Sequence, residues 1–357
     1  MTATRIAVGG ERPHEVVVGL GVQSELPSLI GPAARSVLVI HAAGLAGLAR
    51  SACDVLTGAG YQVQAEPVPD GEVAKDVSVA AGLWSRLAAA GIGRTDAIVA
   101  IGGGALTDLA GFVAATWLRG VAIVLVPTTL LGMTDAAIGG KTAINTAAGK
   151  NLVGAFHPPA GVLADVSSLA TLPHADYASG LAEIIKAGFI ADPVILDLIE
   201  SDPAGAARPG GRHERELIER AVAMKAAVVT ADLREAGQRE MLNYGHTLGH
   251  AIERAEDYTI RHGEAVAIGM CFAAALARLS GRLDEVTAAR HREILTAVGL
   301  PTRYRAGAWP QLRAAMTVDK KARAARLRFV ILAGLARPEI LADPGEELLA
   351  QAYAEVS

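Results

Sequence analysis

The stretch Ala97-Ile-Val-Ala-Ile-Gly-Gly-Gly-Ala-Leu-Thr-Asp108 decides the fold of this chain. Its first five residues are apolar and predict a buried strand, three glycines follow, and residues of about 107–117 predict a helix. Glycines at a strand-to-helix turn let the backbone approach a phosphate group, and a helix N-terminus offers free N–H groups. The turn alone is a weak signal, because it lacks the G-x-G-x-x-G spacing and a tight turn without a ligand looks similar.

Strands and helices alternate on both sides of this turn. Residues 4–19 predict a pair of short strands, and further strands are predicted at 37–41, 61–68 and 121–126, with helices to about residue 56 and over 73–90. This alternation is typical of a parallel sheet with helices on its faces. Thr128 and Thr129 follow the last of these strands, at the carboxyl edge where ligands bind in open α/β folds.

After about residue 170 the strand signals nearly vanish. Apolar residues then recur at helical spacing in the segments 176–200, 214–231, 240–256, 262–281 and 284–298, and residues 201–212, rich in Pro, Gly and Ala, predict a loop. We therefore expect an α/β plus all-α protein. A Rossmann-like, nucleotide-binding domain over 1–170 would be followed by a helical domain over 171–357, and clefts between two such domains commonly hold the active site.

The composition limits the classes of function. With 357 residues, 51% hydrophobic and 20% charged, the chain has ample material for about two folded domains. A net charge of −4 argues against nucleic acid or an anionic membrane as partner, although a small anionic substrate fits. Cys53 and Cys271 are expected to be buried thiols, and the polar N-terminus has no signal-peptide pattern, so we expect a soluble cytoplasmic protein.

Residues 135–151 predict a loop that is rich in polar groups. This segment holds two lysines, two amides and one carboxylate: Asp135, Lys141, Asn145, Lys150 and Asn151. Lysine binds phosphate and asparagine adds directional hydrogen bonds. The alternative is a solvated loop that happens to carry lysines. A lysine in the apolar context of Gly139-Gly140-Lys141 favours an anionic partner.

Histidines and a glutamate cluster farther along the chain. His246 and His250 lie four residues apart on one helical face, His262 follows, and upstream Glu183 and Lys186 stand three residues apart in a predicted helix. Zinc takes imidazole nitrogen and carboxylate oxygen, so these residues predict a metal site. Spacing alone nominates His246 and His250 as joint ligands. The other histidines stand alone and are not expected to be ligands.

Seven runs of sequence, in this order, together resemble the sugar phosphate cyclases: 102–108, 127–131, 139–142, 149–151, 180–186, 243–250 and 262–264. The resemblance covers nearly the whole chain, and the ordered set is far more specific than any one run. It implies an N-terminal NAD-binding domain, a C-terminal helical domain that binds one zinc or cobalt ion, and a homodimer. Within the group the match is best to members whose substrate is 3-deoxy-D-arabino-heptulosonate 7-phosphate.

The resemblance also implies roles for individual residues. Its metal ligands are Glu183, His246 and His262, which differs from the ligand pair that spacing nominates. The residues implied for NAD are Glu72, Lys75, Gly103, Gly104, Asp108, Thr128 and Thr129. One departure concerns the ribose of NAD, because the strand at 37–41 ends in His41-Ala42 where the family often has Asp or Asn.

For the substrate, the resemblance implies three groups of residues. The phosphate is implied to meet Lys141, Asn151, Asn243, a lysine of the pair Lys320-Lys321 and, from the other subunit, Arg119. Its carboxylate is implied to bind Lys225 and Arg239. Hydroxyl and proton-transfer chemistry is implied for Asp135, Lys150, Lys186 and His250.

The activity that follows is phosphate elimination and ring closure, with a hydride taken up by NAD and returned within one turnover. Three alternatives stay open. A related cyclase with a carboxylate-free substrate would leave Lys225 and Arg239 nothing to bind. A metal-dependent glycerol or alcohol dehydrogenase would accumulate NADH. An inactive relative kept as a binding protein would not need the metal ligands.

Overall fold

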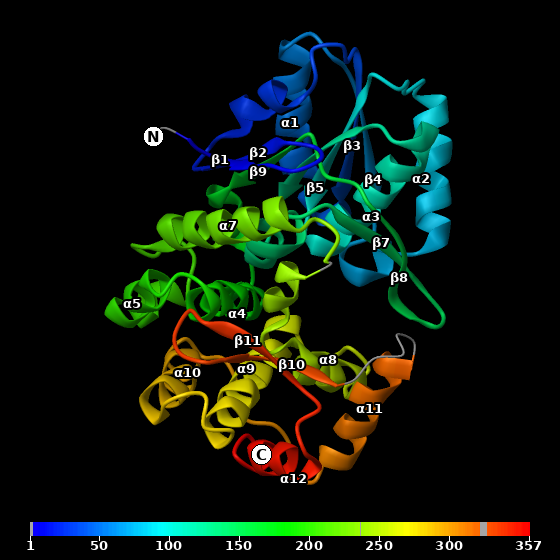
Figure 1. Ribbon diagram of the computed structural model, residues 1–357. Coiled ribbons are helices and arrows are strands. Elements are labelled where there is room, and N and C mark those ends of the chain that lie inside the picture. The colour runs from blue at the N-terminus through cyan, green and yellow to red at the C-terminus, as the bar shows by residue number, and fades with distance from the viewer. Residues whose placement is uncertain (1–2, 236, 322–326) are drawn as a thin grey trace. The chain divides into compact units, whose positions relative to one another are not determined.

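The computed structural model describes residues 3–235, 237–321 and 327–357, without the side chains of 317–321 (Figure 1). The chain divides into two compact units. The first comprises Met1–Leu172 together with Lys225–Arg234, and the second comprises Pro173–Met224 and Glu235–Ser357. A single boundary near residue 170 therefore does not account for Lys225–Arg234, which we expected in the C-terminal domain.

The first unit is built on a seven-stranded sheet in the order β1-β2-β9-β6-β5-β3-β4. β1 and β2 form an antiparallel hairpin, and all other neighbours are parallel. This arrangement confirms the predicted parallel-sheet fold. The strands are β1 (Thr4–Val8), β2 (His14–Gly19), β3 (Ser36–Ala42), β4 (Gln62–Val68), β5 (Ala97–Gly102), β6 (Ala122–Pro127) and β9 (Gly161–Asp165).

Both faces of the central strands are buried, which explains why their sequences read as continuous apolar runs. Val37 and Val39 of β3 share a core cluster with Val99 of β5 and with Leu56 of α1. Side chains alternate along a strand, so the equally buried Ile98 points to the opposite face. The helices of this unit are α1 (Ala46–Gly58), α2 (Val77–Ala89) and α3 (Gly104–Thr116).

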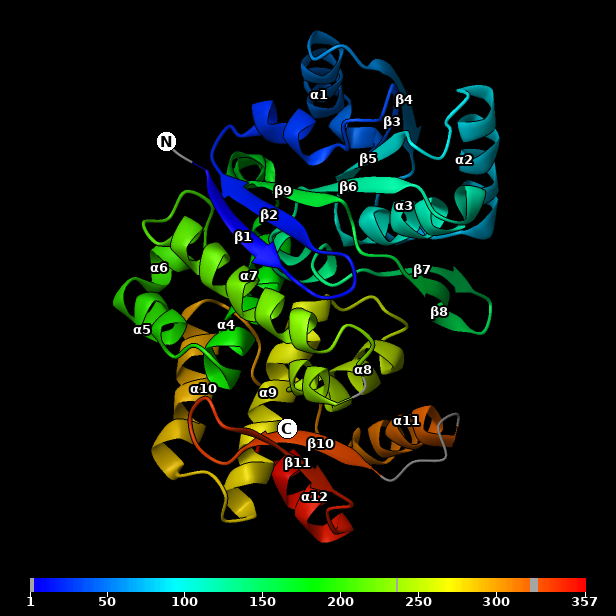
Figure 2. The ribbon, with the colours of Figure 1, turned by 45° about the horizontal axis from the view of Figure 1, so that its top comes forward.

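The expected loop over 135–151 is wrong. A π-helical turn at Gly132–Ala136 is followed by the antiparallel hairpin of β7 (Lys141–Thr146) and β8 (Gly149–Phe156), which extends away from the main sheet (Figure 1, Figure 2). Lysines and glycines interrupt the apolar alternation that signals a strand. Gly154 is required here because a Cβ would lie 2.1 Å from the Thr142 carbonyl oxygen.

The second unit is mainly helical, as predicted, and also contains one small antiparallel sheet that the sequence reading missed. The helices are α4 (His174–Ile190), α5 (Val194–Ser201), α6 (Pro203–Ala206), α7 (Glu214–Ala231), α8 (His246–Ala255), α9 (His262–Leu279), α10 (Glu285–Ala297), α11 (Trp309–Lys321) and α12 (Glu346–Ala354). Residues 225–231 of α7 belong to the first unit. The strands are β10 (Arg328–Leu332) and β11 (Pro338–Ala342).

Three segments differ from the helices and the loop that were expected there, each for a local reason. The expected helix over 176–200 breaks before Pro193, which has no N–H for a helix interior. Within the expected loop over 201–212, the Asp202 carboxylate caps the short helix α6 by accepting from the Gly205 N–H. The expected helix over 240–256 begins only at His246, because a 3-10 turn ends at Asn243 and Gly245 then adopts the left-handed φ of +79°.

Helix α9 runs through the core of the second unit. By length and composition alone it could cross a membrane, but 78% of its apolar window is buried inside the protein. Buried residues occur all around it, including Ala265, Met270 and Leu276. This burial is that of a core helix, whose ends are held in fixed positions by neighbours on all sides. His262, which begins α9, is therefore placed by the packing of the unit.

Candidate active site

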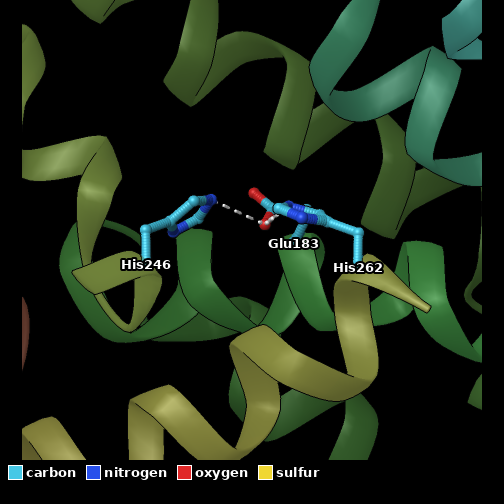
Figure 3. Close-up of side chains that lie close together, drawn as sticks. All are labelled: Glu183, His246 and His262. Carbon is cyan, nitrogen blue, oxygen red and sulfur yellow. Dashed lines mark ion pairs between the residues drawn. The ribbon is translucent and has the colours of Figure 1, made fainter. Parts of the chain in front are cut away.

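Three helices of the second unit bring one carboxylate and two imidazoles together (Figure 3). Glu183 lies in the middle of α4, whereas His246 and His262 are the first residues of α8 and α9. Nε2 of each histidine lies 3.5 Å from Oε1 of Glu183. All three ligand atoms lie within 4.8 Å of one another, which is the separation expected around one metal ion.

Glycines allow the three helices to approach this closely. A Cβ at Gly263, directly after His262, would lie 1.9 Å from the carbonyl oxygen of Ser179 on α4. A Cβ at Gly269 of α9 would lie 1.9 Å from the carbonyl oxygen of Gly245, directly before His246. Backbone therefore packs on backbone beside both histidines, and only glycine fits at these contacts.

Replacing Gly263 by alanine is expected to lower the free energy of unfolding by at least about 2 kcal/mol, because the new methyl group must push α9 from α4. Urea denaturation of the full chain would measure this loss. Gly82→Ala in α2 is the matched control, since a Cβ there meets nothing within 4 Å. A Gly263→Ala variant as stable as the Gly82→Ala variant would contradict this account of the helix contact.

Hydrogen bonds orient both imidazoles toward Glu183. Nδ1 of His246 lies 3.0 Å from the carbonyl oxygen of Tyr244, which can only accept, so Nδ1 carries the proton. Nδ1 of His262 lies 3.3 Å from Oε1 of Glu253. In both rings Nε2 is thereby left to face the carboxylate. This is how proteins prepare histidine to bind a metal.

The charges of the cluster suit a cation. Oε1 of Glu183 is buried without a hydrogen-bond partner among the described residues, while its other oxygen pairs with the buried Lys186. Burial opposes charge on Glu183, yet Lys186 and the imidazoles hold its pKa well below the usual range. Burial and Lys186 keep the pKa of His246 low. Burial favours neutral His262, but the nearby carboxylates of Glu183 and Glu253 raise its pKa to about 10, so a metal ion competes with a proton here.

His250 does not share the site in the way that spacing suggested. Its side chain is exposed, and its potential ligand atoms group with Glu253 and His262, whereas His246 groups with Glu183 and His262. The rings of His246 and His250 meet edge to face, with centroids 5.2 Å apart. The pairing of His246 with His250 as joint ligands is therefore wrong, and His250 lies beside the cluster, where it could exchange protons with solvent.

In the first unit, the glycine turn and the two threonines form one packed edge. Gly103 caps α3, and the Thr128 N–H donates to the carbonyl of Gly102 at 2.9 Å. A Cβ at Gly103 would lie 3.2 Å from Thr129, and a Cβ at Gly104 would lie 3.0 Å from Ala136. The glycines thus serve tight packing, and they leave the backbone at the start of α3 open to an anionic group.

A buried lysine contacts three other predicted site residues in this unit. Lys75 donates to Oδ2 of Asp108 at 2.6 Å and to the side-chain oxygen of Asn151. Glu72 lies 3.9 Å from the Lys75 ammonium and 3.8 Å from that of Lys150. Lys75 is 3% exposed, so its charge depends on these partners. The structure therefore brings together residues predicted for NAD and residues predicted for the substrate.

Asn145 connects this network, although no role was predicted for it beyond membership of a polar segment. Its side chain donates to Oε1 of Glu72 at 2.8 Å and accepts from the Asn151 N–H at 3.0 Å. Its own N–H donates to the carbonyl of Lys75 at 2.8 Å. Asn151 takes the left-handed conformation, φ +59°, which this bond supports. The available signal was the position of Asn145 between the runs 139–142 and 149–151, inside the polar segment.

Lys225 and Asp135 form a second buried contact of the first unit. The Lys225 ammonium donates to the carboxylate of Asp135 and, at 2.6 Å, to its backbone carbonyl. Five residues on, the Thr230 hydroxyl accepts from the Gly9 N–H at 2.8 Å. The Lys225–Arg234 segment is therefore fastened to this unit at two points. Lys225 belongs to the first unit and Arg239, 3% exposed, belongs to the second.

The remaining predicted residues lie at separate places. Arg119 is exposed and takes φ +70° after Leu118 at φ +50°, an uncommon pair of left-handed residues. Lys141 is exposed at the start of β7. Asn243 donates to Oε1 of Glu235 at 3.0 Å. The side chain of Lys320 lies outside the described residues, so the choice within Lys320-Lys321 stays a prediction.

The carboxylate of Asp70 contacts the turn that follows β3. His41 is buried, and its Nδ1 lies 2.9 Å from the carbonyl oxygen of Ala42. These observations do not favour His41 as a ligand of the NAD ribose. Asp70 accepts from the Gly44 N–H through both oxygens, at 3.3 and 3.2 Å. Cys53 is only half-buried, which corrects the expectation of two buried thiols, whereas Cys271 is buried.

Comparison with known proteins gives full-length matches. Residues 65–179 match the model of the 3-dehydroquinate synthase N-terminal part, and residues 180–322 match that of its C-terminal part. The 3-dehydroquinate synthase of Thermobifida fusca is 67% identical over 358 residues, covering 100% of this chain and 97% of that protein.

Two solved structures are similar along their whole length. A 2-deoxy-scyllo-inosose synthase, complexed with carbaglucose-6-phosphate, NAD+ and Co2+, has a TM-score of 0.89 and 28% identity, covering 100% of both chains. A 2-epi-5-epi-valiolone synthase from Streptomyces hygroscopicus, with NAD+ and Zn2+ bound, has a TM-score of 0.88 and 28% identity, covering 99% of both chains. Their likeness agrees with the predicted two-part fold.

Proposed function

The chain belongs to the 3-dehydroquinate synthase family, and on that premise we propose that it converts 3-deoxy-D-arabino-heptulosonate 7-phosphate to 3-dehydroquinate and phosphate, using NAD and one divalent metal ion. The observation that carries this proposal at the site is the cluster of Glu183, His246 and His262, with its unpartnered buried oxygen. The family predicted from the seven runs of sequence is confirmed, and so is its class, a carbon–oxygen lyase that eliminates phosphate.

The proposed metal ion is zinc or cobalt, held by Glu183, His246 and His262. When bound, the ion would polarise a substrate oxygen as a Lewis acid, while NAD would take up and return a hydride. Lys186, 3% exposed beside Glu183, is placed to hold or release a proton next to such an oxygen. His250 is exposed beside the ligands, and we assign it proton exchange with solvent.

The proposed NAD site is the edge of the first unit. Gly103 and Gly104 would meet the pyrophosphate at the start of α3, with Thr128 and Thr129 beside it, as the tight backbone contacts there allow. Glu72, Lys75 and Asp108 would bind the remainder of the cofactor. We further assign Asp70 as the carboxylate that reaches the ribose, because it lies at the turn after β3 where the family often has Asp or Asn. A dissociation constant for NAD unchanged in Asp70→Ala would contradict that assignment.

The proposed roles in substrate binding follow those that the family resemblance implies. Lys141, Asn151, Asn243, one lysine of Lys320-Lys321 and the partner's Arg119 are assigned to the phosphate. Lys225 and Arg239 are assigned to the carboxylate, and Asp135 and Lys150, with Lys186 and His250, to hydroxyl and proton-transfer chemistry. The buried Lys225–Asp135 contact supports an aligned lysine, because a carboxylate already holds its ammonium in one position.

Arg239→Ala is expected to raise the KM for the carboxylated substrate about a hundredfold, because a charge-assisted hydrogen bond to the carboxylate is lost. Steady-state phosphate release over a range of substrate concentrations would measure it. Arg328→Ala is a control, since Arg328 forms an exposed pair with Glu240 at 2.8 Å in the same unit. Unchanged constants in Arg239→Ala would remove the carboxylate assignment and favour a carboxylate-free substrate.

We propose that the protein works as a homodimer in the cytoplasm. Three apolar side chains on β8 are unusually exposed, Leu152 at 63%, Val153 at 42% and Phe156 at 43%, and they suit contact with a second copy. The exposed Arg119 likewise suits a role across a subunit boundary. Sedimentation velocity giving a species of one chain mass would contradict the dimer, and cell fractionation would test the location.

One assay tests the function as a whole. Purified protein is incubated with the heptulosonate 7-phosphate, catalytic NAD and zinc or cobalt, while released phosphate and NADH absorbance are followed. We expect phosphate release without net NADH, abolished by a chelator, and a carbocyclic product. Accumulating NADH would instead support a dehydrogenase, and turnover only of carboxylate-free sugar phosphates would support a related cyclase.

A further inference from the structure

A fully buried histidine in the second unit connects two elements that carry proposed metal ligands. His291 of α10 is 0% exposed, and its ring stacks on Phe189 with centroids 3.5 Å and planes 11° apart. Phe189 lies on α4, the helix that carries Glu183. Nε2 of His291 lies 2.8 Å from the hydroxyl of Tyr244, the residue two positions before His246.

The direction of each hydrogen bond in this chain is fixed. Nδ1 of His291 lies 2.8 Å from the carbonyl of Thr287, which can only accept, so Nδ1 carries the proton and Nε2 accepts from the Tyr244 hydroxyl. Burial lowers the pKa of His291 to about 3. His291 therefore stays neutral at physiological pH, and the bond keeps its direction.

Tyr244 is bonded both to His291 and to the proposed metal ligand His246. Its carbonyl accepts from Nδ1 of His246 at 3.0 Å, and that bond aims Nε2 at Glu183. Tyr244 precedes α8 and is followed by Gly245 at φ +79°, so the helix does not hold this peptide in place. Its N–H donates to the Met241 carbonyl at 3.2 Å, and its fully buried ring is held by the bond to His291.

We propose that Tyr244 and His291 are positioning residues, which set the affinity of the metal centre by holding the carbonyl that orients His246. The proposal rests on the proposed assignment of Glu183, His246 and His262 as ligands. It concerns residues that touch neither the metal nor the substrate. Partners of this kind typically change metal affinity by about ten- to a hundredfold when they are removed.

The test is Tyr244→Phe, which removes only the hydroxyl. We expect the dissociation constant for zinc, measured on the full chain by competition with a chelator, to rise about ten- to a hundredfold. The visible spectrum of the cobalt-loaded variant should also change, since the ring of His246 is no longer held. Tyr177→Phe is the matched control, because Tyr177 is 2% exposed in the same unit and donates to Glu214 at 3.0 Å, away from the ligands.

Wild-type affinity and spectrum in Tyr244→Phe would overturn the proposal, and so would an equal loss in Tyr177→Phe, which would indicate general destabilisation. If Tyr244→Phe does not fold, His291→Gln and His291→Leu ask the same question. The glutamine oxygen can accept from the Tyr244 hydroxyl, so the glutamine variant should bind zinc more tightly than the leucine variant, and equal affinities would contradict the proposal. A wild-type protein that binds no zinc would refute the metal centre itself.

Discussion

Glu183→Gln is expected to lower the rate of phosphate release about a thousandfold and to leave the purified protein largely free of zinc. The amide keeps the size of the side chain but removes the negative charge that two imidazole nitrogens approach at 3.5 Å. A bound metal stabilises the transition state by several kcal/mol, and about 4 kcal/mol corresponds to a factor of roughly a thousand. Metal analysis and the phosphate assay, run on the same preparation, measure both losses.

Two controls separate ligand loss from general damage. Glu214→Gln changes a buried glutamate of the same unit that accepts from Tyr177 at 3.0 Å, and we expect metal content and rate within a few-fold of wild type. Lys186→Met removes the other partner of the ion pair between Glu183 and Lys186. We expect this variant to keep the metal while losing turnover. Full metal occupancy in Glu183→Gln would show that Glu183 is not a ligand.

Lys75→Met is expected to lower the free energy of unfolding of the metal-free, NAD-free protein by roughly 2 to 3 kcal/mol. Removing one partner of a buried ion pair costs about 3 to 5 kcal/mol, because the other charge is left uncompensated. Asp108 keeps 22% of its side chain exposed, so water compensates part of this loss. Arg86→Met is the control, since its exposed pair with Glu66 should contribute less than about 1 kcal/mol.

The deficit of Lys75→Met should shrink in acid. Burial already raises the pKa of Asp108 despite the attraction of Lys75, and losing the lysine raises it further. A carboxyl whose pKa is raised by folding stabilises the protein below its unfolded pKa, about 4, and this contribution is lost as the pH rises through the folded pKa. Urea denaturation of wild type and Lys75→Met, once below about pH 4 and once above the folded pKa of Asp108, measures how the deficit changes with pH. A deficit that does not change with pH would mean that Asp108 is not the group left uncompensated.

Local sequence was enough for the elements that follow one periodicity. The apolar run at 97–101, its glycine turn and the helix behind it appear in the structure as β5 and α3, and the parallel sheet around them is as predicted. The hairpin β7–β8 was missed because its lysines and glycines interrupt the alternation that signals a strand. The hairpin β10–β11 was missed because a short continuous apolar run such as that at 329–332 cannot be told from a buried helix segment by periodicity alone.

By itself, the sequence determined the family, because seven runs in one order identify it whatever their arrangement in space. It could not choose the ligands by spacing: the i and i+4 rule describes one helix, and it paired His246 with His250. Only the packing of α4, α8 and α9 decided that Glu183, 63 and 79 positions upstream of His246 and His262, meets them. The partners of Lys75 stand 33 and 76 residues away for the same reason. Side chains that meet through backbone contacts between distant segments leave no periodic trace in the chain, so tertiary structure alone fixes them.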